Sequence, residues 1–367
     1  MAQKTVVESN KTIRFALVGC GSIAKTQIKA LRELSPLAEL VCICDRIPER
    51  AEALAQEFGL ESIEFETACG DPEIDAITFC TPSGVHAGQA VEALEAGKHV
   101  VVEKPMDVTV EACEKLKAAA DRSGKQFAVI SQHRFDPASK TVSQAIVERK
   151  LGDLVFAEAR IPWYRTQEYY DSGDWRGTWE LDGGGCLMNQ GIHTVDLMLW
   201  LAGPVKRVFA RMKTVAHERI EVEDLITVQV EFASGMMGSL IASTALYPGY
   251  PISLGLFGTT GSAVIEGDEL ETLAIQGEET IRGDGANAHA VQVATGGTRS
   301  ATNEAEKPSD SVWKWGDAHR EQFREFVECI HSGAKPTVTA EDGLAAVRFI
   351  KSCYESAQKG DWIELGG

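Results

Sequence analysis

Residues 13–24 read IRFALVGCGSIA, and this stretch decides the fold. Its first half is a short apolar run rich in β-formers, and its second half fits the pattern G-x-G-x-x-[G/A]. Gly19 suits a tight turn, Gly21 lets a pyrophosphate approach the backbone, and Ala24 lets the following helix pack on the strand. The start of that helix offers free amides and a dipole to phosphates. The stretch therefore predicts a strand, a turn and a helix that bind a dinucleotide.

Strand and helix signals continue to alternate up to residue 131. Further strands are expected at 40–44, 76–80, 99–102 and 127–130, and helices at 48–58, 85–96 and 109–122. The strand at 40–44 is continuously apolar, which is typical of a strand buried on both faces. Alternation at this spacing indicates right-handed crossovers and a parallel sheet with helices on both sides. We expect an α/β fold, with a Rossmann domain at 13–131 after a loose leader at 1–12.

An acid at the end of the second strand, Asp45, suits hydrogen bonds to the adenosine ribose hydroxyls. Its charge would repel the 2′-phosphate of NADP, so Asp45 favours NAD. Arg46 follows at once and could still receive that phosphate. NAD is therefore the expected cofactor, and NADP stays possible.

Two more segments follow predicted strands: CTPSGVH at 80–86 and EKP at 103–105. Together with the glycine turn they resemble the Gfo/Idh/MocA oxidoreductases. The resemblance continues from the glycines at 183–185 to His193 and into EDG at 341–343, so it covers nearly the whole chain. It implies a Rossmann domain followed by an α/β domain built on a large, mostly antiparallel, open-faced sheet. In this family the open face commonly packs against another subunit.

The second domain is expected over 132–367. Strand-like runs lie at 154–161, 205–214, 225–233, 236–244, 252–257 and 262–266. Such a sheet has an apolar face to cover, which favours a homodimer or homotetramer. Residues 278–310 are rich in small polar types and are expected to form a long loop.

The resemblance also implies which residues bind the cofactor. They are Gly19, Gly21, Ser22, Ile23, Asp45, Arg46, Thr81, Pro82, His86, Glu103 and Lys104. Lys104 lies just past a strand end, where open α/β sheets place their ligands. Its ammonium could hydrogen-bond a substrate hydroxyl and stabilise developing negative charge. A nearby positive nicotinamide would lower its pKa, so Lys104 is a candidate catalytic and substrate-binding residue.

A second constellation runs from Gly183 into a helix expected to end near Ala202. Asn189 and His193 are four residues apart, so they share one face of that helix. In relatives such as inositol dehydrogenase an acid and a histidine four residues later line the active site, and the histidine takes the hydroxyl proton. His193 matches that catalytic histidine, but an amide stands at the acid position and cannot stabilise an imidazolium by charge. Asp196 is a possible substitute partner, and Lys104 is the alternative proton acceptor.

Residues 163–179 hold six aromatic side chains and two arginines, against 7% aromatics in the whole chain. Aromatic faces stack on sugars and bases, and arginines hold phosphates or carboxylates. The expected substrate-binding residues are Lys104, Arg165, Tyr169, Trp175, Arg176, Asn189 and His193. This segment looks more like family members that act on sugars or nucleotide sugars, such as UDP-N-acetylglucosamine 3-dehydrogenases, than like the inositol branch.

Composition narrows the partners. The 367 residues carry a formal charge of −18, which argues against nucleic acid and anionic membranes. No apolar run approaches the length of a membrane span, and the N-terminus has no apolar stretch typical of a secretory signal. None of the nine cysteines forms a CxxC pair, so we expect buried free thiols, no metal site and a cytoplasmic location.

These features favour an NAD(P)-dependent dehydrogenase that oxidises a ring secondary alcohol of a sugar, sugar derivative or nucleotide sugar. The same site could reduce a ketosugar, or recycle a tightly held cofactor between two substrates. A non-catalytic dinucleotide sensor is the alternative from another class. The presence of both Lys104 and His193 argues against it.

Overall fold

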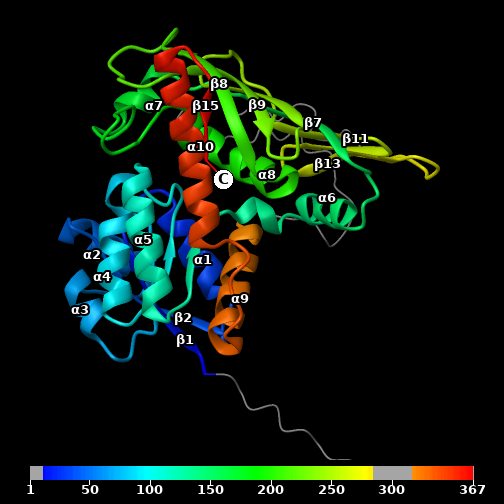
Figure 1. Ribbon diagram of the computed structural model, residues 1–367. Coiled ribbons are helices and arrows are strands. Elements are labelled where there is room, and N and C mark those ends of the chain that lie inside the picture. Colours follow the sequence, from blue (N-terminus) through cyan, green and yellow to red (C-terminus); the bar gives the residue numbers. More distant parts are fainter. Residues whose placement is uncertain (1–10, 284–315, 367) are drawn as a thin grey trace, which may run out of the picture.

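The computed structural model describes residues 11–283 and 316–366 (Figure 1). Six parallel strands form the first sheet in the order β3-β2-β1-β4-β5-β6. Their bounds are β1 (Ile13–Val18), β2 (Ala38–Cys44), β3 (Glu61–Ser62), β4 (Ala76–Phe79), β5 (His99–Val102) and β6 (Phe127–Val129). This is the doubly wound sheet that the sequence predicts, and β1 lies at its centre.

The connecting helices are α1 (Ala24–Arg32), α2 (Pro48–Phe58), α3 (Phe65–Gly70), α4 (His86–Glu95) and α5 (Val110–Ser123), with short 3₁₀ turns η1 (Ser83–Val85) and η2 (Gln132–Phe135). Local signals set the ends of α2, because Pro48 occupies its first turn and Gly59 closes it in the left-handed conformation at φ 63°. The helices predicted at 48–58, 85–96 and 109–122 are thus confirmed to within one or two residues at each end.

In the part of the chain that the structure describes, nine strands form the second sheet, in the order β14-β13-β12-β11-β7-β10-β9-β8-β15. They are β7 (Leu154–Pro162), β8 (Val205–Lys213), β9 (Leu225–Phe232), β10 (Met237–Ser243), β11 (Ser253–Gly258), β12 (Gly261–Glu266), β13 (Glu269–Ile275), β14 (Ile281–Arg282) and β15 (Ile363–Glu364). Among the described residues only β7 and β10 of this sheet pair in parallel, so the expected mostly antiparallel sheet is confirmed.

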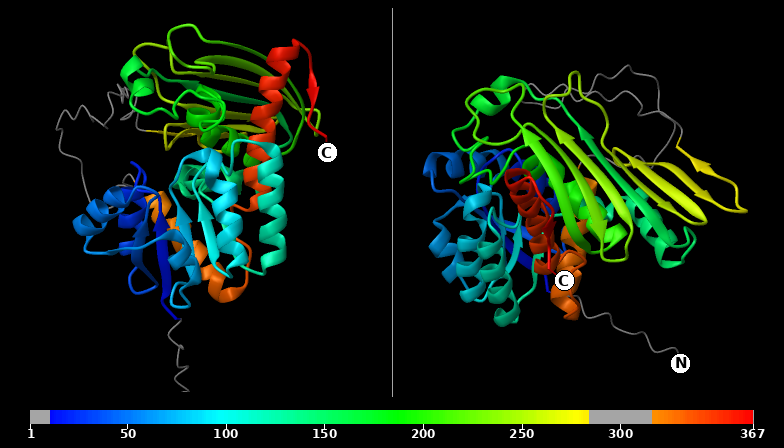
Figure 2. Two further views of the ribbon diagram at one scale, coloured as in Figure 1. Left: turned by 90° about the vertical axis from the view of Figure 1, so that its left-hand side faces the viewer. Right: turned by 45° about the horizontal axis from the view of Figure 1, so that its top comes forward.

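Helices cover one face of this sheet, as the two views in Figure 2 show. They include α6 (Pro137–Val147), α8 (Ile192–Ala202) and α10 (Ala340–Lys359), while α7 (Gln167–Asp171) lies near the sheet's end (Figure 1). Ala157, Ala159 and Ile161 of β7 point into the resulting core and are fully buried. The alternate side chains face outward, which is the pattern of a sheet packed on one side.

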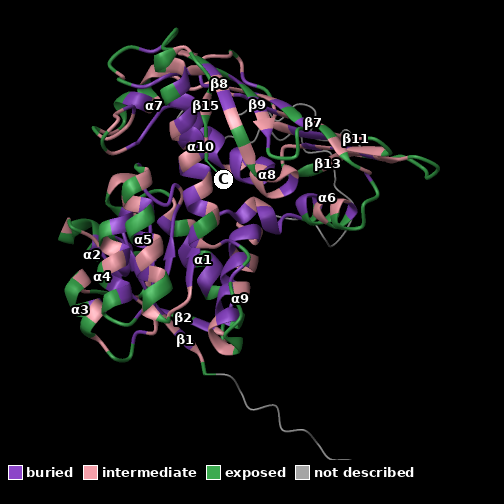
Figure 3. Ribbon diagram, viewed as in Figure 1, coloured by how far each residue is buried: buried purple, intermediate pink, exposed green. Residues whose placement is uncertain are grey.

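The C-terminal helices join the two halves of the molecule. Helix α9 (Asp317–Ser332) packs on the Rossmann sheet, where the ring of Phe323 lies 5.9 Å from that of Phe15. Helix α10 contacts α5 and β6 at one end and β8 at the other. The burial pattern in Figure 3 shows α10 lined by buried residues through much of its length. Residues beyond 131 therefore contribute to the core of both halves.

Several expectations meet their limits here. The leader at 1–12 is described only at residues 11 and 12, and most of the expected 278–310 loop lies outside the described residues. Within 278–283, β14 pairs with β13, so a loop was the wrong prediction for Ile281–Arg282. All nine cysteines are free thiols, and seven of them are buried. In the part of the chain that the structure describes, no helix combines the length and apolarity needed to cross a membrane.

Candidate active site

The glycine turn after β1 fits a dinucleotide. Gly19 has φ 98°, and a Cβ there would lie 2.6 Å from the backbone carbon of Cys80, so only glycine is accommodated. A Cβ on Gly21 would meet only the Cys80 carbonyl oxygen, at 3.7 Å, which leaves open space over the turn. Helix α1 starts at once after this turn, and no side chain caps its N-terminus. Its first amides are therefore available to phosphates.

Asp45 sits beside this turn, at the end of β2. Its carboxylate accepts the backbone N–H of Cys20 at 2.8 Å and that of Ile47 at 2.8 Å. A carboxylate has further lone pairs, so these two bonds orient Asp45 without exhausting its capacity for ribose hydroxyls. Arg46 next to it is exposed.

Two other turns end at the same edge of the sheet. Thr81 and Pro82 follow β4, and Glu103, Lys104 and Pro105 follow β5. His86 is 1% exposed and joins them, with Nδ1 2.8 Å from the Pro105 carbonyl and Nε2 2.9 Å from that of Thr81. The His86 ring therefore holds the turn after β4 and the turn after β5 together. Ser22 and Ile23 stay partly or fully exposed in the first turn.

Lys104 reaches from the Rossmann half to the second domain. Its Nζ donates to the backbone carbonyl of Asn189 at 3.0 Å. Burial lowers the pKa of Lys104, and the guanidinium of Arg176 lowers it further, whereas the carboxylates of Glu103 and Asp182 oppose this. Glu103 is buried, accepts from Gln27 at 2.7 Å, and has a pKa raised by that burial. The ammonium of Lys104 is thus held for proton exchange nearer neutral pH than an exposed lysine.

The helix that carries Asn189 and His193 begins differently from the prediction. Residues Cys186–Gly191 form a π-helical segment, η3, and the α-helix α8 starts only at Ile192. An α-helix was therefore the wrong prediction for the first six residues. Buried Glu223 fixes this start from outside, accepting the N–H groups of Gly185 at 2.8 Å and Leu187 at 2.9 Å. Gly185 lies so close to Glu223 that a Cβ would fall 1.7 Å from its carbonyl oxygen.

His193 faces a second histidine. Its ring lies 5.2 Å from that of His133, edge to face. Among the described residues the His193 imidazole makes no hydrogen bond, so its nitrogens are free for a ligand. Burial holds the pKa of His193 well below its usual range, and the charges of Lys104 and His133 add to this. His193 is accordingly a neutral imidazole, the state that can accept a proton.

His133 is clamped between two carboxylates. Its Nδ1 lies 2.7 Å from Asp136 and 3.2 Å from Asp268. The three potential ligand atoms lie within 4.8 Å of one another, a spacing that a metal ion could use. Burial lowers the pKa of His133, but hydrogen bonds to the two carboxylates outweigh it and bring the pKa to about 10. The distances and this pKa fit a protonated Nδ1. His133 is therefore a positively charged neighbour of His193.

Asp196 does not take the role suggested for it. Its two oxygens accept from Arg134 Nε at 2.8 Å and Nη2 at 2.7 Å, and the Ser131 hydroxyl also bonds to it. Arg134 bonds in addition to Asp342 at 3.0 Å. Asp196 is therefore committed to a structural ion pair, and the idea of a carboxylate partner for His193 at that position is wrong.

A carboxylate that sequence reasoning missed stands close by. Asp182 is 3% exposed, accepts the side-chain amide of Asn189 at 2.6 Å and takes the Gly177 N–H at 2.9 Å. It acts on Lys104 and is itself acted on by Arg176 through charge. Asp182 thus places a carboxylate beside Asn189, from seven residues upstream of it. Helical spacing could not reveal it, because Asp182 precedes the glycine turn and lies outside the helix.

The aromatic segment gathers two cations. The guanidinium of Arg165 lies over the rings of Trp163 and Tyr169, at 4.7 and 5.2 Å. That of Arg176 lies over Tyr169 and Trp175, at 4.3 and 4.4 Å. The Tyr169 hydroxyl accepts from Gln190 at 3.0 Å. Within the described ranges neither arginine forms an ion pair, and Arg165 Nε is buried without a hydrogen-bond partner.

The structure thus brings the predicted catalytic and substrate residues to one region. Lys104 and His193 line one small cavity of about 20 Å³ together with Ser131 and Ile192. Asn189 bridges Lys104 and Asp182, and the charge of Arg176, from the aromatic segment, lowers the pKa of Lys104. The glycine turn and Asp45 lie at the carboxyl edge of the sheet that also carries Lys104.

This chain is similar in sequence and in structure to several known proteins. The model of an oxidoreductase family with an NAD-binding Rossmann fold matches residues 13–131, and that of the GFO/IDH/MocA C-terminal domain matches 139–264. The structure of the WlbA dehydrogenase from Bordetella pertussis, in complex with NADH and UDP-GlcNAcA, is 31% identical with a TM-score of 0.82, covering 97% of this chain and 99% of that one. The inositol 2-dehydrogenase of Rhizobium meliloti is 27% identical, over 96% of this chain and 99% of its own. The scyllo-inositol 2-dehydrogenase (NADP(+)) IolW of Bacillus subtilis is 26% identical over 86% of each.

Proposed function

This chain belongs to the Gfo/Idh/MocA family of NAD(P)-dependent oxidoreductases, and we propose that it oxidises a ring secondary alcohol of an anionic sugar, such as a sugar acid or a nucleotide sugar. The half-buried Arg165, which has no ion-pair partner among the described residues, carries the choice of an anionic substrate. A cation removed from water is unfavourable unless a counter-charge meets it. A carboxylate or phosphate of the substrate would supply that charge.

The chemistry rests on His193 and Lys104. A bound nicotinamide would accept the hydride from the carbon that bears the hydroxyl. His193 takes the hydroxyl proton, because its imidazole is neutral and its ring nitrogens have no hydrogen-bond partner among the described residues. Lys104 donates a hydrogen bond to the same oxygen and stabilises the negative charge that develops as the proton leaves. The alternative, in which Lys104 accepts the proton, uses its lowered pKa.

The reverse reaction uses the same groups. His193 then returns its proton to the oxygen of a ring ketone, so reduction of a ketosugar is open to this site. The physiological direction depends on the supply of oxidised or reduced cofactor.

For the cofactor we propose NAD ahead of NADP. The support is Asp45, which two backbone N–H groups hold at the edge of the glycine turn, where it would meet the ribose hydroxyls. Arg46 is exposed and nearby, so NADP binds if it outweighs the repulsion from Asp45.

We also propose a homodimer or homotetramer that forms through the open face of the second sheet. Phe156, Met237 and Phe257 are cross-strand neighbours on that face, and Met237 is 66% exposed. An apolar patch of this kind is typical of an interface. Light scattering on the purified protein, with Met237→Lys as the variant expected to dissociate it, tests this proposal. The nine free thiols support a cytoplasmic location.

The substrate proposal is tested by following NADH formation with a matched panel: UDP-N-acetylglucosamine and its uronic acid, glucuronate, glucose and myo-inositol. We expect the anionic sugars to give the highest kcat/KM with NAD. His193→Asn should lower kcat by about 10²-fold or more without changing NADH binding. A higher kcat/KM for glucose or inositol than for every anionic sugar would contradict the proposal.

A further inference from the structure

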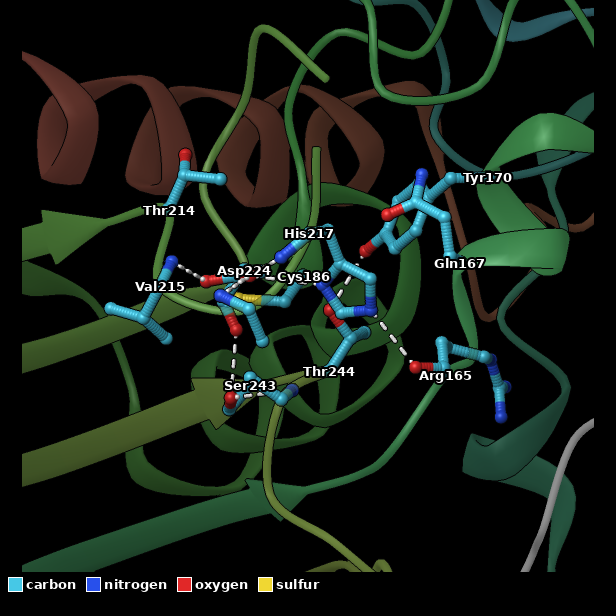
Figure 4. Close-up of polar contacts among 12 residues, drawn as sticks. Arg165, Gln167, Tyr170, Cys186, Thr214, Val215, His217, Asp224, Ser243 and Thr244 are labelled. Atoms are coloured by element: carbon cyan, nitrogen blue, oxygen red, sulfur yellow. Dashed lines mark hydrogen bonds and ion pairs between the residues drawn. The ribbon is translucent and has the colours of Figure 1, made fainter. Parts of the chain in front are cut away.

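His217 lies in the connection between β8 and β9, apart from Lys104 and His193, and is buried. Figure 4 shows its ring between a carboxylate and a backbone carbonyl. Nδ1 lies 2.9 Å from Asp224 Oδ2, and Nε2 lies 2.9 Å from the carbonyl oxygen of Arg165. An ionised carboxylate and a carbonyl only accept hydrogen bonds, so both ring nitrogens donate. His217 is therefore an imidazolium that links Asp224 to the backbone of a substrate-side arginine.

Asp224 is the fixed end of this link. It is fully buried, and its carboxylate also accepts the backbone N–H groups of Val215, Ala216 and His217 at 2.7, 2.8 and 3.0 Å. Burial raises the pKa of Asp224, but the hydrogen bond from the His217 ring and these backbone bonds hold it below its usual range. The Asp224 side chain is thus a rigid anchor for the segment that presents His217.

A second route leads from the same residue to Arg165. The backbone carbonyl of Asp224 accepts the Thr244 N–H at 2.9 Å and the Ser243 hydroxyl at 2.7 Å. The carbonyl of Thr244 in turn accepts the N–H of Arg165 at 2.8 Å. Both polar groups of the Arg165 backbone are therefore tied to Asp224, one through Thr244 and one through His217.

The side chain of Arg165 leaves this anchored backbone for the aromatic segment. Its guanidinium lies between two rings, and the ring of Tyr170 packs 4.6 Å from that of His217. Because no carboxylate of the described residues holds Arg165, its direction depends on the backbone and on these rings.

We propose that the Asp224–His217 pair is the positioning device for Arg165 and so determines how tightly the enzyme holds the anionic group of its substrate. The inference rests on the proposed function, since it assigns a specificity role within the same site. The pair touches neither Lys104 nor His193 in any contact of the described residues. Its loss should weaken substrate binding and leave the chemical step intact.

Two substitutions at one position separate the links. The amide nitrogen of asparagine can stand in for Nδ1, so His217→Asn keeps the bond to Asp224 and loses the one to Arg165. The longer glutamine can stand in for Nε2, so His217→Gln keeps the bond to Arg165. We expect His217→Asn to raise KM for the anionic sugar by about tenfold, the loss of one charge-assisted bond, with kcat within about threefold. His217→Gln should raise KM less.

Gln167→Ala is the matched control. Gln167 joins the same two segments by two bonds to the backbone of Glu218, at 2.8 and 2.9 Å, without touching Arg165 (Figure 4 labels Gln167). If Gln167→Ala raises KM as much as His217→Asn, general loosening explains the effect and the inference is overturned.

A double-mutant cycle with Arg165→Gln tests the route of action. If His217 acts through Arg165, His217→Asn adds little to KM in the Arg165→Gln background. A full tenfold addition there would overturn the inference. If the unmodified enzyme shows no preference for anionic sugars, the proposed function fails first. Should that preference stand while both His217 variants keep the original KM, only the positioning role fails.

Discussion

Arg134 and Arg165 both precede the catalytic helix in the sequence, but their side chains are bonded in opposite ways. Arg134 is 4% exposed and meets two carboxylates, Asp196 and Asp342, with three bonds of 2.7 to 3.0 Å. Arg165 is half-buried between aromatic rings and meets no carboxylate in the described residues. A buried cation with a full set of partners holds structure together, whereas one without them is prepared for a charge that arrives from outside.

The largest effect should come from removing Arg134 from its ion pairs. Arg134→Met leaves Asp196 buried with only the Ser131 hydroxyl, so we expect a loss of about 3–5 kcal/mol in the free energy of unfolding, measured in urea. The double variant Arg134→Met with Asp196→Leu should recover much of that loss, because the buried carboxylate is then gone and the remaining one, Asp342, is partly exposed and still accepts hydrogen bonds from Thr339. Equal instability of both variants would contradict this assignment.

Removing the charge of Arg165 should affect substrate binding rather than stability. Arg165→Gln removes the charge without orphaning a carboxylate, so the free energy of unfolding should change by less than about 1 kcal/mol. KM for an anionic sugar should rise by about 30- to 100-fold, with kcat nearly unchanged. Steady-state kinetics and urea unfolding on one preparation check both halves. A stability loss like that of Arg134→Met would remove the contrast between the two arginines.

A smaller effect is expected from Asp182, whose removal should shift the pH dependence of the reaction in one direction. Asp182 opposes the lowering of the Lys104 pKa, so Asp182→Asn should lower that pKa further. If the Lys104 ammonium is the required form, the alkaline limb of the kcat/KM profile moves to lower pH by about 0.5 to 1 unit. Movement of the acidic limb instead would make neutral Lys104 the proton acceptor. Thermal melts at each pH control for unfolding.

The smallest effect concerns the support of Arg165. Hydrogen bonds to Asp224 and Arg165 raise the pKa of His217 although burial lowers it. A raised pKa stabilises the fold fully below the unfolded value of about 6.5, and this contribution is lost as pH rises through the folded value. The stability difference between the unmodified enzyme and His217→Asn should therefore shrink on going from pH 6 to 9, in urea unfolding. A constant difference would mean that His217 is not charged.

The parts that could be predicted from sequence are those in which neighbours along the chain do the work. The glycine turn, Asp45 and the lysine after β5 lie in short motifs whose geometry follows from one strand and one helix. Asp182 and His217 escape such reasoning because their partners, Asn189 and the Arg165 backbone, are reached through space. The π-helical start of the catalytic helix could not be predicted either, because buried Glu223, just before β9, holds it through hydrogen bonds to the N–H groups of Gly185 and Leu187. Sequence periodicity indicates which face of a helix is apolar. It does not indicate which residue, distant in sequence, accepts a hydrogen bond from a backbone N–H of that helix.

Helix α10 has a consequence for how the enzyme is made. Tyr354 of this helix accepts the N–H of Met188 at 3.2 Å and donates to Glu223 at 3.0 Å, and Lys351 holds the Gly183 carbonyl at 2.7 Å. Helix α9, just before it, completes the core of the Rossmann half. A chain still on the ribosome therefore lacks these supports of both halves until α9 and α10 have emerged. A chain that stopped before α9 would lack the contacts that complete both halves.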